Sequence, residues 1–246
     1  MEKRITVSFC IPLYNEEQTL LKSLTRIELG LAKTVGPDNF EIVLVDNGST
    51  DSTRELLKQI NNPHIKVFYI NKKGQGLAYK KCIKEAVCEY ILLSAIDLPF
   101  GFGDLEQFLD KKRESDIIFG SKNHPYSKIK VPLTRKVTSF IYNALLSALF
   151  RIKIRDTQGT VFAKKSSILK ILPLCDAQNA FFTAQIAIYA QKYRLSVTEI
   201  PVKYNAGKKG ARKSRYNIPL DGSKMLNSLL KEFVNNQFFN KPHKRK

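Results

Sequence analysis

An aspartate, Asp97, follows an apolar segment that has the composition of a buried strand. The segment runs from Tyr90 to Leu93, and a turn towards Pro99 comes next. In open α/β sheets ligands bind at the carboxyl edge of the strands, where a carboxylate can hold a hard divalent cation against phosphate groups. The same residues are expected if Asp97 only begins a turn. This segment alone therefore leaves two interpretations open, a metal ligand and a turn residue.

Three more clusters of polar or glycine residues come after apolar segments. They are Pro12-Leu13-Tyr14-Asn15-Glu16, Asp46-Asn47-Gly48-Ser49 and Gly74-Gln75-Gly76. Each is weak alone, because Asp-Asn-Gly-Ser is an ordinary turn and Gly-x-Gly falls far short of a dinucleotide fingerprint. In this order, and together with Asp97, they predict a nucleotide pocket. An aromatic ring would pack against the base, acids and amides would hydrogen-bond to it, and an acid would hold a metal ion.

The elements that must position these clusters alternate between strand and helix. Apolar segments favour strands at residues 7–12, 40–45, 65–70, 116–120 and from Tyr90 to near Asp97, and residues at helical spacing lie between them. This alternation predicts parallel βαβ units, and so an α/β fold with a Rossmann-like, mostly parallel sheet flanked by helices.

The second half of the chain favours amphipathic helices. Apolar residues recur at helical spacing from Val137 to Phe150, with basic residues on both sides. This helix is too short to span a bilayer but suits the plane of a membrane surface, and packing into the core is the open alternative. A helix at 181–193, a strand at 197–204 and a last amphipathic helix from Leu226 to Phe233 are also expected.

Composition narrows the class of protein. The 246 residues carry 41 Lys and Arg against 22 Asp and Glu, a net charge of +19 that favours nucleic acid, anionic lipid or phosphorylated ligands. Basic residues gather at 208–215 and in the tail 241–246. The four cysteines lack zinc-site spacing, which favours reduced thiols in a cytosolic protein. No apolar run has the length of a membrane span, and the N-terminus does not read as a signal peptide.

The first two motifs, followed by Asp97-Leu98, resemble the family 2 glycosyltransferases with a GT-A fold. In the second half, four features resemble the branch that contains dolichyl-phosphate mannose synthase and dolichyl-phosphate glucosyltransferase. These features are Gly120-Ser121-Lys122, the long apolar helix, Arg155-Asp156-Thr157-Gln158-Gly159 and Glu199-Ile200-Pro201-Val202. The resemblance runs from about Val7 to Tyr216.

The resemblance implies roles for particular residues. The nucleotide would be held by Pro12, Tyr14, Glu16, Val45, Asp46, Asn47 and Ile96, where Asn47 replaces the usual second Asp. Asp97 would bind Mg²⁺ or Mn²⁺. The charges of donor and acceptor would be offset by Lys122, Lys209 and Arg215.

Two departures from the family pattern bear on the chemistry. The Asp-x-Asp motif is Ala95-Ile96-Asp97 here, so one carboxylate is missing, although Mg²⁺ often combines few carboxylates with substrate phosphates and water. Thr183 and Gln185 replace an acidic pair. A phosphate acceptor tolerates this second change, because an ionised oxygen needs no general base.

The sequence therefore predicts a peripheral enzyme on the cytoplasmic face of a membrane. It would move a sugar from a nucleoside diphosphate sugar to a polyprenyl phosphate with inversion. Three alternatives remain open: a family 2 transferase acting on a saccharide hydroxyl, a non-catalytic nucleotide-sugar-binding protein, and a basic nucleic-acid binder, which has no nucleic-acid motif to support it.

The expected domain organisation is one transferase domain over residues 1–216. Its nucleotide-binding half ends near 122, and its acceptor- and membrane-facing half follows. An amphipathic helix and a basic tail occupy 217–246.

Overall fold

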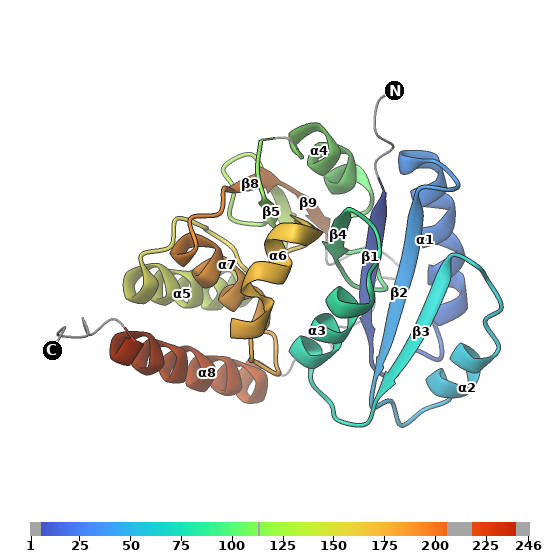
Figure 1. Cartoon of the computed structure of the whole chain (residues 1–246). Helices are drawn as coiled ribbons and strands as arrows, with labels where there is room; N and C mark the ends of the chain where they lie inside the picture. Colours follow the sequence, from blue (N-terminus) through green and yellow to red (C-terminus); the bar gives the residue numbers. More distant parts are fainter. Residues whose placement is uncertain (1–5, 113, 206–217, 240–246) are drawn as a thin grey trace, which may run out of the picture.

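A seven-stranded sheet in the order β3-β2-β1-β4-β7-β5-β8 carries the candidate site (Figure 1). The computed structural model describes residues 6–112, 114–205 and 218–239. The strands are β1 (Val7–Leu13), β2 (Phe40–Asn47), β3 (Ile65–Ile70), β4 (Tyr90–Leu93), β5 (Ile117–Ser121), β7 (Val161–Lys164) and β8 (Val197–Pro201). A separate pair joins β6 (Lys128–Lys130) to β9 (Lys203–Asn205).

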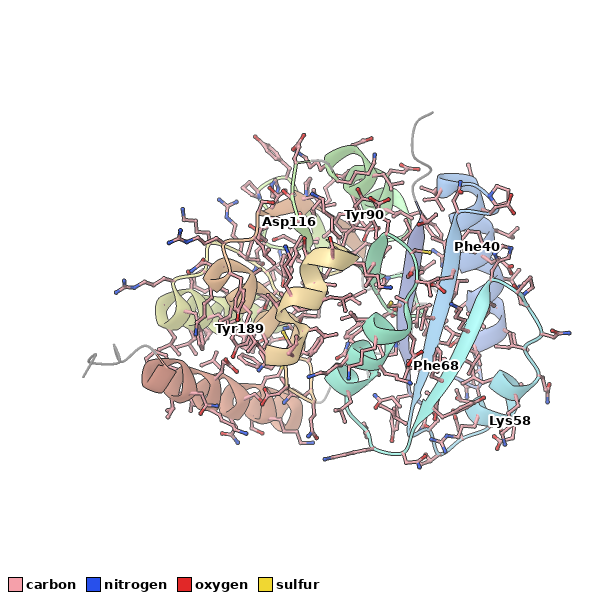
Figure 2. All side chains as sticks on the ribbon, viewed as in Figure 1. Phe40, Lys58, Phe68, Tyr90, Asp116 and Tyr189 are labelled. Atoms are coloured by element: carbon pink, nitrogen blue, oxygen red, sulfur yellow. The ribbon has the colours of Figure 1, made fainter. Side chains whose placement is uncertain are left out.

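The sheet is mostly parallel, as predicted. β1 pairs in parallel with β2 and β4, β2 with β3, and β5 with β8, whereas β7 runs antiparallel between β4 and β5. The register pairs Leu13 with Asp46, so β1 and β2 end together. In Figure 1 the parallel strands β1 and β2 start at the end of the sheet near the N terminus and point towards the opposite end. Phe40, labelled in Figure 2, is the first residue of β2 and lies at the starting end.

Helices cover both faces of the sheet, so β1 and β2 are buried on both sides. The helices are α1 (Leu20–Val35), α2 (Thr53–Lys58), α3 (Gln75–Glu85), α4 (Gly103–Lys111), α5 (Leu133–Phe150), α6 (Lys165–Ile171), α7 (Phe182–Lys192), α8 (Ile218–Phe239) and the 3₁₀ turn Leu172–Leu174. α1 and α4 pack with Phe9 and Ile11 on one face, and α3, α6 and α7 pack with Cys10 and Val43 on the other. All four cysteines are unpaired.

Several expected strand boundaries were wrong. The strand expected from Tyr90 to near Asp97 ends at Leu93, four residues before that aspartate. The strand expected at 197–204 breaks at Val202, whose N–H donates to Ser127 Oγ at 2.9 Å, so that β8 and β9 belong to different sheets. Asp46 and Asn47, expected in a turn, are the last residues of β2. Their side chains are therefore fixed by the strand instead of moving with a loop.

α5 packs partly into the core and also exposes apolar side chains. Leu146 is fully buried in the core, whereas Leu133, Val137, Phe140, Ile141 and Leu145 are exposed. The exposed residues recur at helical spacing, so they form a continuous apolar strip, here called the α5 strip. α8 packs beside α5 through an edge-to-face contact of Phe233 with Phe150, and exposes Leu226, Leu230 and Val234. Within the described ranges, no helix has the length and apolarity needed to cross a bilayer.

Candidate active site at the carboxyl edge

The loop after β1 is tied to the segment after β2 by hydrogen bonds. Asn15 N–H donates to Ser49 Oγ at 2.9 Å, and Thr50 N–H donates back to Asn15 Oδ1 at 2.7 Å. Glu16 is buried, and its N–H donates to Thr53 Oγ1 at 2.7 Å. The first two predicted clusters therefore form one connected rim at the carboxyl edge.

Tyr14 supplies the aromatic surface of this rim. The Nζ of Lys73, from the turn before α3, lies 3.8 Å from the centroid of the Tyr14 ring. A cation over an aromatic face is held by the quadrupole of the ring. Lys73 was not predicted as a site residue from the sequence. The signal that would have identified it is the basic turn Lys72-Lys73-Gly74.

Asn47 joins the end of β2 to the glycine turn. Its Oδ1 accepts the N–H of Gly74 at 2.5 Å, and Gly74 immediately precedes α3. The turn is packed tightly, since a Cβ added at Gly76 would lie 2.0 Å from the carbonyl oxygen of Ala177. The predicted glycine cluster is thus brought against the predicted β2 cluster.

Asp46 is fully buried and paired. Its Oδ2 lies 2.5 Å from Nε of Arg54 on α2, and Ser49 N–H donates to its Oδ1 at 3.2 Å. Arg54 also donates to the carbonyl oxygen of Ile70 at 3.0 Å. Arg54 was not identified from the sequence, because a single Arg on an amphipathic helix carries no local signal.

The other predicted nucleotide residues contribute mainly to the scaffold. Val45 is fully buried against α3, and Ile96 is buried in the core on the α1 face. Pro12 is half-buried within β1, opposite Val45 in the register. Their roles towards a nucleotide remain predictions.

Asp97 lies exposed in a turn four residues beyond β4. The turn is closed by the N–H of Leu98, which donates to the carbonyl oxygen of Ala95 at 3.1 Å. Tyr79 Oη donates to the carbonyl oxygen of Ser94 at 3.0 Å and fixes the start of this segment. Burial, with a smaller contribution from the nearby charge of Asp97, raises the pKa of Tyr79 well above its usual range.

The fit of a divalent metal ion can be judged from the donor atoms. Within the described residues, no group of three or more His, Cys, Asp or Glu side chains is arranged to hold a metal ion. Asp97 offers one exposed carboxylate at the expected edge. This donor set fits Mg²⁺ or Mn²⁺ where a diphosphate completes the coordination, because both ions take oxygen ligands and Mg²⁺ commonly keeps water and substrate phosphates.

Lys122 is held in place beyond the end of β5. Its Nζ lies 2.9 Å from Asp156 Oδ2 and donates to the carbonyl oxygen of Gln158 at 2.9 Å. The same Nζ lies 5.8 Å from the ring centroid of Phe100, in the loop that follows Asp97. A Cβ at Gly159 would lie 1.7 Å from the carbonyl oxygen of Gly120, so glycine permits this close approach. Lys122 is therefore a fixed cation next to the Asp97 loop.

The two positions on α7 that lack the acidic pair have other bonding partners. Thr183 Oγ1 accepts Gln158 Nε2 at 3.3 Å, which links α7 to the loop that holds Lys122. Gln185 is buried and donates to Asp176 Oδ1 and Glu232 Oε2, both at 2.7 Å. Tyr189, labelled in Figure 2, reaches from α7 to Glu232 of α8 at 2.5 Å. Gln185 therefore anchors α8. Lys209 and Arg215 lie outside the described residues.

Residues 8–172 match the sequence profile of the family described as Glycosyl transferase family 2. This chain belongs to that family. The resemblance is thereby confirmed, and the protein is an enzyme of the glycosyltransferase type.

Two curated relatives are both named as dolichyl-phosphate beta-glucosyltransferases. The dolichyl-phosphate beta-glucosyltransferase of Saccharomyces cerevisiae is 26% identical over 253 residues, which is 93% of this chain and 74% of the relative. A dolichyl-phosphate beta-glucosyltransferase of Trichomonas vaginalis is 27% identical over 217 residues, covering 82% of this chain and 66% of the relative.

One solved structure shows the same fold. Glucosyl-3-phosphoglycerate synthase from Mycobacterium tuberculosis, crystallised with Mn²⁺, uridine-diphosphate-glucose and phosphoglyceric acid, matches with a TM-score of 0.62. The match covers 94% of this chain and 80% of that one at 16% identity. This supports the GT-A expectation for the fold of this family 2 member.

Proposed function

We propose that this protein transfers a hexose, with glucose as the first candidate, from a nucleoside diphosphate sugar to a polyprenyl phosphate of the dolichyl type. The names of the yeast and Trichomonas relatives support the sugar and the acceptor. One oxygen of the lipid phosphate attacks the anomeric carbon and forms the new bond. The bond from that carbon to the diphosphate breaks, the nucleoside diphosphate leaves, and the configuration is inverted.

The choice of a phosphate as the acceptor rests on two positions of α7 that have no acidic side chain. A saccharide hydroxyl needs a base to take its proton, but Thr183 and Gln185 are neutral and engaged in hydrogen bonds. A lipid phosphate is already ionised, and its attack requires cations that bring two anions together. Lys122 supplies one such cation, and Lys209 and Arg215 are predicted to supply two more.

The carboxyl edge would hold the donor nucleotide. The ring of Tyr14 packs against the base once the ammonium of Lys73 moves aside, and Asn47 offers its amide to the base edge. Asp97 would hold the divalent ion, which supplies charge neutralisation for the leaving diphosphate. Lys122, fixed by Asp156, orients the phosphates from the other side of the Asp97 loop.

The α5 strip would place the enzyme on a membrane at its cytoplasmic face. Exposed Phe140 and Ile141 lie on the apolar side of a helix that is followed by the exposed cations Arg151 and Lys153. An apolar helix face with flanking cations binds at the headgroup boundary of anionic bilayers. Such binding brings the active edge within reach of a phosphate on a lipid tail.

The test is a panel of radiolabelled nucleotide sugars incubated with the full chain, polyprenyl phosphate and a divalent metal salt. We expect label to enter the organic phase with one donor sugar, and the product to release that sugar in mild acid. Label that enters only a water-soluble saccharide would overturn the acceptor. No transfer from any donor would overturn the proposed function.

A further inference from the structure

The small parallel sheet of β6 and β9, here called the β6–β9 ribbon, carries three exposed lysines. The register pairs Lys128 with Lys203, and Lys130 lies two residues further along β6. Residues two apart on a strand share a face, as do paired residues of neighbouring strands, so the three ammonium groups leave the ribbon on one side. Like charges placed directly opposite each other are destabilising, and a bound anion would relieve this repulsion.

No acidic side chain compensates this charge within the part of the chain that the structure describes. None of the three lysines makes an ion pair there. The sequence gives one reason, because residues 117–155 contain eight Lys and Arg but no Asp or Glu. Asp156, the next acid along the chain, is fully buried and paired with Lys122. The ribbon is therefore left with an excess of positive charge at the surface.

The ribbon is attached firmly to the active edge. Ser127, just before β6, donates through Oγ to the carbonyl oxygen of Ser121 at 2.6 Å and accepts the N–H of Val202 at 2.9 Å. The N–H of Lys128 donates to the carbonyl oxygen of Val202 at 3.0 Å. Ser121 is the last residue of β5 and immediately precedes Lys122. Whatever the ribbon binds is thus held at a fixed position relative to Lys122.

Apolar side chains beside the ribbon indicate the kind of partner. β6 ends at Lys130, and the α5 strip begins three residues later with Leu133, which is 74% exposed. On the other side of β6, Tyr126 is 80% exposed. Aromatic rings favour the headgroup level of a bilayer, and lysines reach its phosphates while their stems cover apolar surface. A nucleic acid would neutralise the lysines but would leave Leu133 and the α5 strip in water.

We propose that the β6–β9 ribbon binds the phosphate headgroups of an anionic bilayer through Lys128, Lys130 and Lys203. The inference rests on the membrane contact of the proposed function, and it adds the surface that responds to the charge of the lipids. The α5 strip supplies apolar insertion, and the ribbon supplies electrostatic attraction. Because the ribbon is attached next to Lys122, this contact turns the active edge towards the layer that holds lipid phosphates.

The experiment is flotation of the full chain with liposomes of phosphatidylcholine alone or mixed with phosphatidylglycerol, without sugar donor or acceptor. Attraction to an anionic surface is worth about fivefold in binding for each nearby lysine. Replacing Lys128, Lys130 and Lys203 together by Gln should therefore weaken binding to the anionic liposomes about 100-fold. Replacing the same three by Arg should preserve binding, because the charge is kept.

The matched control removes the same charge elsewhere. Lys22→Gln, Lys33→Gln and Lys58→Gln change exposed lysines on α1 and α2, and together they should weaken binding less than about threefold. Equal losses in the two Gln triple variants would overturn the proposal, because net charge alone would then explain the attraction. A ribbon variant that keeps its affinity for liposomes but loses binding of a single-stranded oligonucleotide would assign the ribbon to nucleic acid instead.

A single replacement keeps the test decisive if the ribbon triple variant does not fold. Lys203→Gln alone should weaken binding to anionic liposomes about fivefold, and a loss of less than about twofold would contradict the proposal. Since the assay contains no sugar donor, a failure here leaves the transfer reaction of the proposed function untouched. Conversely, a failure to transfer label in the donor panel leaves the binding result standing.

Discussion

Lys122 and Asp156 form an ion pair of 2.9 Å between the end of β5 and the loop before β7. The carboxylate is fully buried, and it also accepts the backbone N–H groups of Lys122 at 2.8 Å and Gln158 at 2.9 Å. Such a fixed cation costs little side-chain entropy when a phosphate binds. The pair therefore gives Lys122 two separable roles, one in stability and one in charge neutralisation.

Replacing Lys122 separates these roles. Lys122→Met should lower transfer about 100-fold by removing a charge-assisted contact, and should lower the free energy of unfolding by about 3 kcal/mol because Asp156 loses its partner. Adding Asp156→Asn removes the unpaired buried charge but leaves one oxygen for the two backbone N–H groups, so it should restore only part of the stability and none of the transfer. Urea unfolding and initial rates measure the two effects, with Lys58→Met, at the exposed end of α2 in Figure 2, as the control. Transfer that returns in the double variant would make Lys122 purely structural.

Asp97 should be required for the response to a divalent ion. Asp97→Asn keeps the size of the side chain but weakens its affinity for a hard cation, so transfer should fall about 100-fold and should no longer increase with Mg²⁺ or Mn²⁺. Initial rates over a range of metal concentrations test this. Asp110→Asn, an exposed acid on α4, should behave as the wild type. Unchanged stimulation in Asp97→Asn would remove the metal role.

The α5 strip should bind anionic membranes. Phe140→Asp with Leu145→Asp places charges on side chains that are 70% and 39% exposed, so the fold should be kept and flotation with anionic liposomes should be lost. The matched control is Leu21→Asp with Leu29→Asp, two exposed leucines on α1. Equal flotation of both double variants would refute the α5 contact. A loss of circular dichroism in the α5 variant would show that the strip belongs to the core.

Asp104 should make stability depend on pH. Burial raises the pKa of its carboxyl to about 6, although Thr160 Oγ1 donates to it at 2.8 Å. The folded state keeps this proton where the unfolded state has lost it, so the free energy of unfolding should fall as pH rises from about 4 to about 6.

Asp104→Asn removes this titration. The variant should be more stable than the wild type above pH 6, on the order of 1–3 kcal/mol. Urea unfolding from pH 4 to 7 measures both proteins. Parallel pH profiles would show that Asp104 does not titrate in this range.

The sequence predicted the parts of the fold that depend on local pattern. β1 and β2 are long apolar segments, and only a strand buried on both faces accommodates them. The polar clusters after these strands met at one edge because parallel strands end together. β7 was missed, since Val161–Lys164 is short and its antiparallel place between β4 and β5 depends on distant partners.

The side-chain pairs of the site could not be predicted in the same way. Asp46 meets Arg54, and Tyr14 meets Lys73, through the packing of separate elements. For α5, the sequence showed apolar residues at helical spacing over one broad side of the helix. Which of them face the core, as Leu146 does, and which form the α5 strip depends on the position of α8 and the sheet.

The most direct test of the proposed function compares two acceptors that differ only in the phosphate. Polyprenyl phosphate and the corresponding polyprenol are presented in the same anionic liposomes with the same labelled donor. The account predicts sugar transfer to the phosphate and none to the alcohol, because the residues on α7 provide no base. Transfer to the alcohol at a comparable rate would contradict it.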